Sequence, residues 1–359
     1  MDRALDIPGD GLMGSMPATE LVSWYGGHPD AVADSIALTA RSVVVVGAGN
    51  VALDVTRMLA KEPGALIDTD VPQHVLDVLA NSQIADIHLV ARRGPAHAKF
   101  TTKELRELGK LPNVDIVVDP AELVLDDEGQ RRAEEDRTVQ SNLDTLREWS
   151  QQPVRGRPRR IHIRFLLSPL AIHGECAVES VEFERMVPDG AGGARSSGRQ
   201  VRIPAQLVVR SIGYRGVALP GVVFDATSGT IPNLEGRVVH DGSNAPGQYV
   251  VGWIKRGPTG VIGTNRPDAK QTVGHLLDDL DHAGVTPRPD LYEQLPGEGV
   301  RIVDWTGWQA IERHEESLGR AAGRKRVKVT DRAELFMIGA SKAPAAGHRR
   351  HAKPHRCED

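Results

Sequence analysis

The stretch Val43-Val44-Val45-Val46-Gly47-Ala48-Gly49-Asn50-Val51-Ala52-Leu53-Asp54 decides the fold. Its four consecutive valines predict a strand that is buried on both faces, as in a parallel sheet. The spacing Gly47-x-Gly49-x-x-Ala52 predicts a tight bend, then a position without a Cβ where a pyrophosphate can approach, then a small residue where a helix packs on the strand. Unpaired N–H groups and the dipole at the start of that helix would hold the phosphates of a dinucleotide. The alternative is a tight turn with a structural role only.

The composition is that of an ordinary soluble globular protein, with 26% charged and 40% hydrophobic residues, and 359 residues predict about two domains. A net charge of −4 does not indicate a nucleic-acid binder, and no run is apolar enough for a membrane span or a signal peptide. Cys176 and Cys357 form no Cys-x-x-Cys pair, which argues against zinc ribbons, iron–sulfur ligation and a redox-active disulfide. We therefore expect free thiols, no metal site and a cytoplasmic location.

A second strand is predicted over residues 84–91, and Arg92 and Arg93 follow it directly. In an NAD site this strand usually ends in an acidic residue that binds the adenosine ribose, whereas a 2′-phosphate needs positive, forked donors. The two arginines therefore favour NADP(H). They follow the glycine turn by about 43 residues instead of the usual 20 or so, and an extra helix predicted near residues 70–80 explains the difference. Solvated surface is the alternative for such a pair.

Two acidic residues lie on helices predicted next to the glycine turn. Asp54 shares with Asn50, four residues earlier, a helix face that is separate from the apolar one. A solvated helix carboxylate is the alternative for Asp54. Thr101 and Glu104 match the capping box of another helix, which gives Glu104 a sufficient structural role of its own.

A strand that leads into a glycine-rich turn occurs a second time, at residues 248–253 and 257–265. The helix predicted after it has an apolar stripe, and the backbone donors at its start could face another anion or a cofactor carbonyl. A flexible turn is the alternative. The tail from residue 343 onward is basic and contains histidines without metal-ligand spacing on an ordered frame, so we expect disorder there.

Five motifs, in order along the chain, resemble those of the adrenodoxin-reductase-type ferredoxin–NADP⁺ reductases. They are residues 47–54, Arg92-Arg93-Gly94, Phe100-Thr101-x-x-Glu104-Leu105-Arg106-Glu107-Leu108, Ser211-Ile212-Gly213-Tyr214, and Gly252-Trp253-x-x-Arg256-Gly257-Pro258-Thr259-Gly260-Val261-Ile262-Gly263-Thr264-Asn265. The resemblance implies an α/β fold in which a Rossmann-like NADP-binding domain is inserted in an FAD-binding domain. It also implies that a hydride passes from NADPH to the flavin and that single electrons leave for a ferredoxin-type iron–sulfur protein.

The resemblance further implies roles for individual residues. Those expected to contact NADP(H) are Gly47, Ala48, Gly49, Asn50 and Val51 at the phosphate turn, Arg92 and Arg93 at the 2′-phosphate, and Glu104 at the adenosine end. Those expected to lie against FAD are Trp253, Gly260, Val261 and Ile262, with Gly260 also near the nicotinamide. Asp54 is the expected catalytic residue, as part of the polar group around the reacting rings.

The expected domains are a connecting segment (1–40), the NADP-binding domain (41–214), the C-terminal part of the FAD-binding domain (215–342) and a disordered tail (343–359). The family begins with a strand and a Gly-x-Gly-x-x-Gly loop for the FAD pyrophosphate, roughly a hundred residues ahead of Met1. We therefore expect an FAD-binding domain that is incomplete in this chain. Two alternatives are an N-terminally truncated NADP(H)-binding remnant without turnover and the NADPH-oxidising subunit of a glutamate-synthase-type complex.

Overall fold

The computed structural model describes residues 2–31, 36, 38–258, 260, 262–283 and 302–340, with only the backbone given at 262, 282 and 283. Its largest body is built on a six-stranded sheet in the order β1-β9-β2-β3-β5-β4, in which every neighbouring pair is parallel. The strands are β1 (Ser15–Pro17), β2 (Ser42–Val46), β3 (Asp86–Val90), β4 (Val114–Val118), β5 (Arg159–Arg164) and β9 (Leu207–Arg210). The buried parallel strand predicted from the valine run is thus confirmed.

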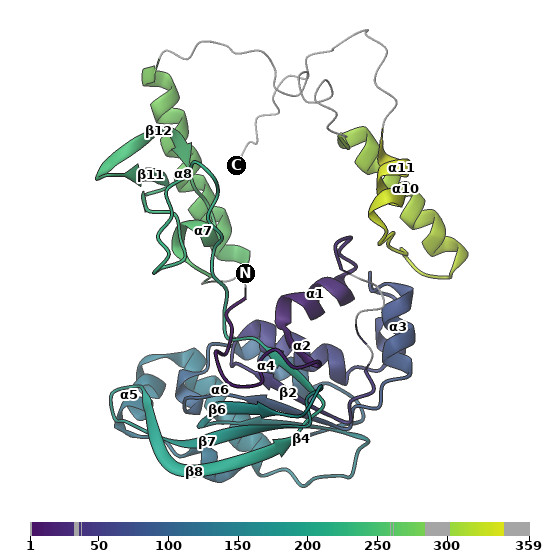
Figure 1. Cartoon of the computed structure of the whole chain (residues 1–359), viewed down its shortest axis with the longest axis vertical. Coiled ribbons are helices and arrows are strands. Elements are labelled where there is room, and N and C mark those ends of the chain that lie inside the picture. The colour runs from purple at the N-terminus through teal and green to yellow at the C-terminus, as the bar shows by residue number, and fades with distance from the viewer. Residues whose placement is uncertain are drawn as a thin grey trace.

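Helices cover one face of this sheet, and a second, antiparallel sheet covers the other (Figure 1). The covering helices are α1 (Ala18–Gly26), α2 (Asn50–Ala60), α3 (Gln73–Ala80), α4 (Thr102–Gly109) and α6 (Arg137–Ser150). The antiparallel sheet contains β6 (Leu167–His173), β7 (Ser180–Pro188) and β8 (Ala194–Pro204). The remaining elements of this body are α5 (Asp127–Glu135) and the short 3-10 helices η1 (Pro63–Leu66), η2 (Pro95–His97) and η3 (Pro120–Leu123).

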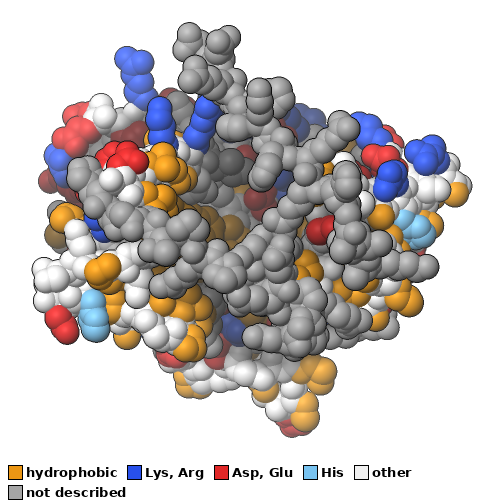
Figure 2. Space-filling view, turned by 90° about the horizontal axis from the view of Figure 1, so that it is seen from above, with side chains coloured by type: hydrophobic (Ala, Val, Ile, Leu, Met, Phe, Trp, Pro, Cys, Tyr) orange, Lys and Arg blue, Asp and Glu red, His pale blue; other side chains and the backbone are white. Residues whose placement is uncertain are grey.

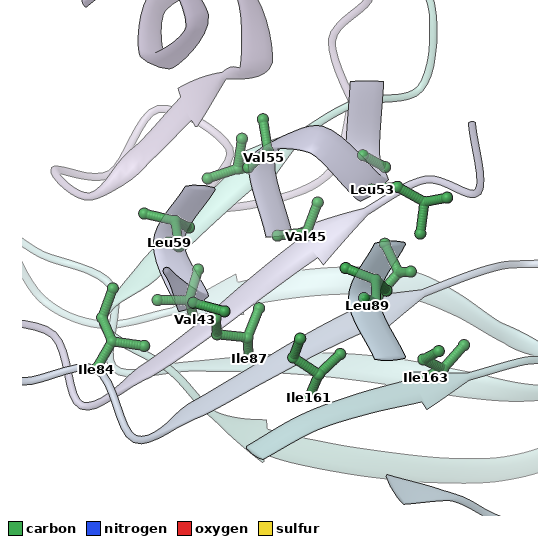
Figure 3. Packing of buried hydrophobic residues seen from close by; sticks show 14 of the residues in the cluster. Val43, Val45, Leu53, Val55, Leu59, Ile84, Ile87, Leu89, Ile161 and Ile163 are labelled. Carbon is green, nitrogen blue, oxygen red and sulfur yellow. The ribbon is translucent and has the colours of Figure 1, made fainter. Parts of the chain in front are cut away.

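The valine run fills both layers of the core. Val43 and Val45 pack with the helices, whereas Val44 and Val46 pack with the antiparallel sheet, and all four are at most 4% exposed. Figure 3 shows Val43 and Val45 among the side chains of the helix-facing layer. Burial of each valine stabilises the fold by roughly 1.5 kcal/mol or more, so this short strand anchors both layers.

A buried carboxylate joins the two sheets. Glu122, which is 1% exposed, accepts hydrogen bonds from the guanidinium groups of Arg164 and Arg185 and from the N–H of Phe165. Arg164 belongs to the parallel sheet and Arg185 to the antiparallel one. A charge removed from water in this way requires several donors, and here both sheets supply them.

Two histidines of neighbouring parallel strands stack on each other. The ring centroids of His88 on β3 and His162 on β5 are 4.5 Å apart with an interplanar angle of 14°. His88 Nδ1 is buried and has no hydrogen-bond partner among the described residues. Burial, with His162 as a smaller contribution, lowers the pKa of His88 from its ordinary value of 6.5 to about 4.

The fold should therefore lose stability as the pH falls from about 6.5 toward 4. The pKa of His88 is lower in the folded chain than in the unfolded chain. On acidification the unfolded chain therefore binds this proton first, which lowers its free energy relative to the folded chain. The contribution of His88 amounts to about 2 kcal/mol between pH 7 and pH 5.

Urea unfolding at both pH values checks this for the wild type and for His88→Leu, which should show a shallower pH dependence. His240→Leu, at an exposed position, should keep the wild-type slope; equal slopes in all three proteins would contradict the assignment.

A second body follows the parallel sheet along the chain. It contains the antiparallel strands β10 (Asn233–Leu234), β11 (Arg237–His240) and β12 (Ser243–Tyr249), and the helices α7 (Trp253–Arg256) and α8 (Ile262–Ala283). Ile231, Val238 and Val250 form its small core. Arg237 of β11 donates two hydrogen bonds to the carboxylate of Asp279, which ties α8 to this sheet.

The C-terminal helices α10 (Trp305–Ala321) and α11 (Arg332–Gly339) pack on one another, and the segment between them contacts the first body. The guanidinium of Arg324, which is 7% exposed, donates to the carbonyl oxygens of Ile67, Thr69 and Val71. Lys328 Nζ donates to the Gly26 carbonyl at 3.0 Å. The residues after α10 thus hold the loop that precedes α3.

Figure 2 looks down on the upper part of Figure 1 and shows hydrophobic side chains exposed among charged ones. On α8, Val273, Leu277 and Leu280 are 49%, 55% and 44% exposed. The apolar stripe predicted for this helix therefore exists, but the other described residues leave it uncovered. Across the described ranges, none of the helices combines the length and the apolar character required to cross a membrane.

Candidate dinucleotide-binding site

The turn between β2 and α2 has the geometry that its glycine spacing predicts. Gly47 adopts φ +139°, and a Cβ on it would lie 2.1 Å from the Ser211 carbonyl oxygen. The Gly47 N–H donates to the Val90 carbonyl at 2.9 Å. A Cβ on Gly49, by contrast, would meet no described atom within 4 Å. The first glycine is therefore required by the protein's own packing, whereas the second borders open space.

The first turn of α2 presents unpaired N–H groups beside that space. Gly49 is the N-cap residue, and no side chain caps the helix. Leu53 donates to the Gly49 carbonyl at 3.2 Å, and Ala52 is fully buried against the sheet. Within the described chain the N–H groups of Asn50 and Val51 have no acceptor. Together with the positive end of the helix dipole, they suit an anion.

The segment before α4 forms a second side of this turn. The Lys99 N–H donates to the Ala48 carbonyl at 2.8 Å, and the Thr101 N–H donates to Asn50 Oδ1 at 2.8 Å. The Asn50 side chain therefore fixes a segment that is 51 residues away in sequence. Its backbone N–H still faces outward from the helix start.

The capping box predicted for α4 forms only in part. Thr101 Oγ1 accepts from the Glu104 N–H at 3.4 Å, as predicted. The reciprocal bond was predicted wrongly, because Asn50 Oδ1 already accepts from the Thr101 N–H. The Glu104 carboxylate instead lies 3.8 Å from Arg57 Nη2.

Arg92 and Arg93 follow β3, the strand beside β2. Val46 pairs with Val90, so both strands end at the same edge of the sheet. Arg92 is exposed and Arg93 is half-buried. Among the residues that the structure describes, neither guanidinium has a hydrogen-bond or ion-pair partner. Two free cations therefore follow the strand that ends beside the open turn.

Asp54 and Glu104 lie together although they come from different helices. Arg57 Nη2 is 2.6 Å from Asp54 Oδ1 and 3.8 Å from Glu104 Oε2. Burial, followed by the nearby Asp54 carboxylate, raises the pKa of Tyr25. Sequence analysis missed Arg57. The signal that could have revealed it is the polar series Asn50, Asp54, Arg57, whose i, i+4, i+7 spacing places all three on one helix face.

The second glycine-rich turn follows β12. Gly252, Gly257 and Gly260 adopt φ values of +73°, +81° and +85°, a region that favours glycine. Trp253 is 46% exposed, and its ring stacks on Tyr214 with centroids 5.7 Å apart. Tyr214 thereby links the end of the first body to the start of α7.

Two of the residues predicted to contact FAD are not fully described. Val261 lies outside the described residues, and Ile262 is described by its backbone only, as the first residue of α8. The tail predicted to be disordered, 343–359, also lies outside them.

The parallel sheet, the open turn after β2 and the free arginines after β3 define a dinucleotide-binding protein of the α/β class. No protein-family model matches the chain. It is 44% identical over 349 residues to NADPH-ferredoxin reductase FprA of Mycobacterium leprae, covering 94% of this chain and 75% of that protein. It is 36% identical to mitochondrial NADPH:adrenodoxin oxidoreductase of Drosophila melanogaster, covering 94% of this chain and 72% of that protein.

A solved structure of Mycobacterium tuberculosis FprA in complex with NADPH superposes with a TM-score of 0.86 at 44% identity. The match covers 95% of this chain and 76% of that one. The chain belongs to the adrenodoxin-reductase-type family of NADPH–ferredoxin reductases. The two-dinucleotide-domain fold predicted from the sequence is confirmed.

Proposed function

We propose that this chain oxidises NADPH and passes the electrons through FAD to a ferredoxin-type iron–sulfur protein. The single observation that carries the proposal is the pair of free guanidinium groups, Arg92 and Arg93, after the strand beside an open phosphate turn. Membership of the ferredoxin-reductase family supports it, and the names of relatives in that family state NADPH and ferredoxin or adrenodoxin.

The residues around the β2–α2 turn fit an NADP(H) molecule. The pyrophosphate would bind at the N–H groups from Ala48 to Val51, because Gly49 borders open space there. Arg92 and Arg93 would bind the 2′-phosphate, for which two forked cations are suited. Glu104 would contact the adenosine end.

FAD is assigned to the second glycine-rich turn, against Trp253 and residues 260–262. The exposed Trp253 ring fits a flat cofactor that stacks against it. When bound, FAD accepts a hydride from NADPH and releases electrons singly. The task of the protein is to hold the two rings together and to order polar groups such as Asp54 around them.

The domain boundaries form part of the same proposal, with NADP bound by residues 41–214 and FAD by residues 215–342. Residues 1–40 lead into the NADP-binding domain, and β1 and α1 of this segment pack on its sheet. The cytoplasmic location inferred from cysteine usage is likewise proposed, and cell fractionation would test it.

The decisive experiment combines a visible spectrum of the purified chain with ferredoxin-coupled reduction of cytochrome c. We expect a flavin spectrum and turnover with NADPH that greatly exceeds turnover with NADH. A colourless protein that binds NADPH but has no turnover would instead support the NADP(H)-binding remnant. Flavin-dependent NADPH oxidation that ferredoxin does not stimulate would favour the subunit of a glutamate-synthase-type complex.

A further inference from the structure

One face of α2 carries a series of polar side chains directed at α4. Asn50 and Arg57 lie seven residues apart, which places them on the same helix face. At the first position Asn50 accepts from the Thr101 N–H, at the N-cap of α4. Two turns later the guanidinium of Arg57 lies 3.8 Å and 3.9 Å from the carboxylates of Glu104 and Glu107 on α4. The α2–α4 interface therefore begins at the phosphate turn and continues through these contacts.

Arg57 is shared among three carboxylates. Its Nη2 lies 2.6 Å from Asp54 Oδ1 and 3.8 Å from Glu104 Oε2, and its Nη1 lies 3.9 Å from Glu107 Oε2. Its side chain is 27% exposed, so solvent screens these contacts only in part. Lys110 Nζ is 2.7 Å from Glu107 Oε1 and is a second cation at the edge of the cluster.

The charge balance of this cluster depends on Arg57. Asp54, Glu104 and Glu107 carry three negative charges against the two positive charges of Arg57 and Lys110, so the cluster has a net charge of −1. Without Arg57 the net charge would be −2, close to the helix start that is to receive a pyrophosphate. The carboxylates would then repel one another and the incoming anion.

We propose that Arg57 is a positioning residue for dinucleotide binding. Its guanidinium holds α4 against α2 through Glu104 and Glu107, and this fixes the segment that forms the second side of the phosphate turn. It also offsets the carboxylates that would otherwise repel the pyrophosphate. The inference rests on the proposed function, because it assumes that the turn binds NADP(H). Because Arg57 would act through the pyrophosphate, which both nucleotides carry, its loss should weaken the binding of NADPH and of NADH equally.

The test is a calorimetric titration of the full chain with NADPH and with NADH at low salt. Arg57→Gln should weaken both nucleotides by the same factor, roughly 10-fold, the size expected for one partly buried charge effect. Arg57→Gln combined with Glu107→Gln should recover part of the affinity, because the cluster regains its net charge of −1 while the ion pairs between α2 and α4 stay lost. A purely structural loss of packing would not be rescued in this way. Arg199→Gln, which removes an exposed guanidinium from β8, is the matched control and should bind like the wild type.

Wild-type affinity in Arg57→Gln would overturn the inference, and so would a loss that Glu107→Gln does not relieve. Should Arg57→Gln not fold, Arg57→Lys replaces it, because one ammonium group cannot span from Asp54 to Glu107 as a guanidinium does. Wild-type affinity for both nucleotides in Arg57→Lys would equally overturn it. Failure of the proposed function is distinguishable, because the wild type itself would then show no preference for NADPH.

Discussion

Replacing both Arg92 and Arg93 by alanine should weaken NADPH binding by about 2 kcal/mol or more, that is at least roughly 30-fold, while NADH binding changes little. Charge-assisted pairs with a phosphate are individually worth about 1.5–3 kcal/mol. Only NADPH carries the 2′-phosphate, so only its affinity should fall. Because neither guanidinium bonds to another described residue, the double variant should fold as the wild type does.

Fluorescence or calorimetric titration with both nucleotides measures this selectivity directly. The matched control is Arg195→Ala with Arg199→Ala, which removes two exposed guanidinium groups from β8. This control separates loss of the phosphate contact from a general change in net charge. An equal loss for NADPH and NADH in the Arg92 and Arg93 variant would refute the 2′-phosphate role.

Replacing Gly47 by alanine should lower the stability of the protein, whereas replacing Gly49 by alanine should weaken nucleotide binding. Gly47→Ala places a Cβ 2.1 Å from the Ser211 carbonyl in a backbone of φ +139°, so the protein should lose about 3 kcal/mol of stability. Gly49→Ala meets no described atom within 4 Å and has φ −115°, which any residue adopts, so its stability should hardly change. The added methyl group should instead occupy the place of the pyrophosphate and weaken both nucleotides by about 2 kcal/mol.

Melting temperatures and nucleotide titrations of the two variants check this contrast. We expect a melting temperature lower by roughly 6–12 °C for Gly47→Ala and an unchanged one for Gly49→Ala. Gly64, which also borders open space but lies in η1, provides the control substitution Gly64→Ala. A Gly49→Ala protein that binds both nucleotides as tightly as the wild type would place the pyrophosphate elsewhere.

The sequence alone determined the central strand, the turn and the position of the arginines. Four consecutive β-branched residues bury both faces of β2, and this property depends only on neighbouring residues. The glycine spacing is equally local, because φ +139° at Gly47 is a requirement of one backbone position. Arg92 and Arg93 could be placed beside the turn because the carboxyl ends of neighbouring parallel strands share an edge.

Only the tertiary structure decided which side chains complete this site. The clash that makes Gly47 obligatory comes from Ser211, and the partner that takes the Thr101 N–H from Glu104 is Asn50, 51 residues earlier. Arg57 likewise contacts carboxylates on another helix. Periodicity reports which face of an element is buried, but the choice among possible hydrogen-bond and ion-pair partners depends on how the elements pack. That choice is made between residues far apart in the chain, so a local pattern can indicate the helix face on which Arg57 lies but not the partners that it contacts.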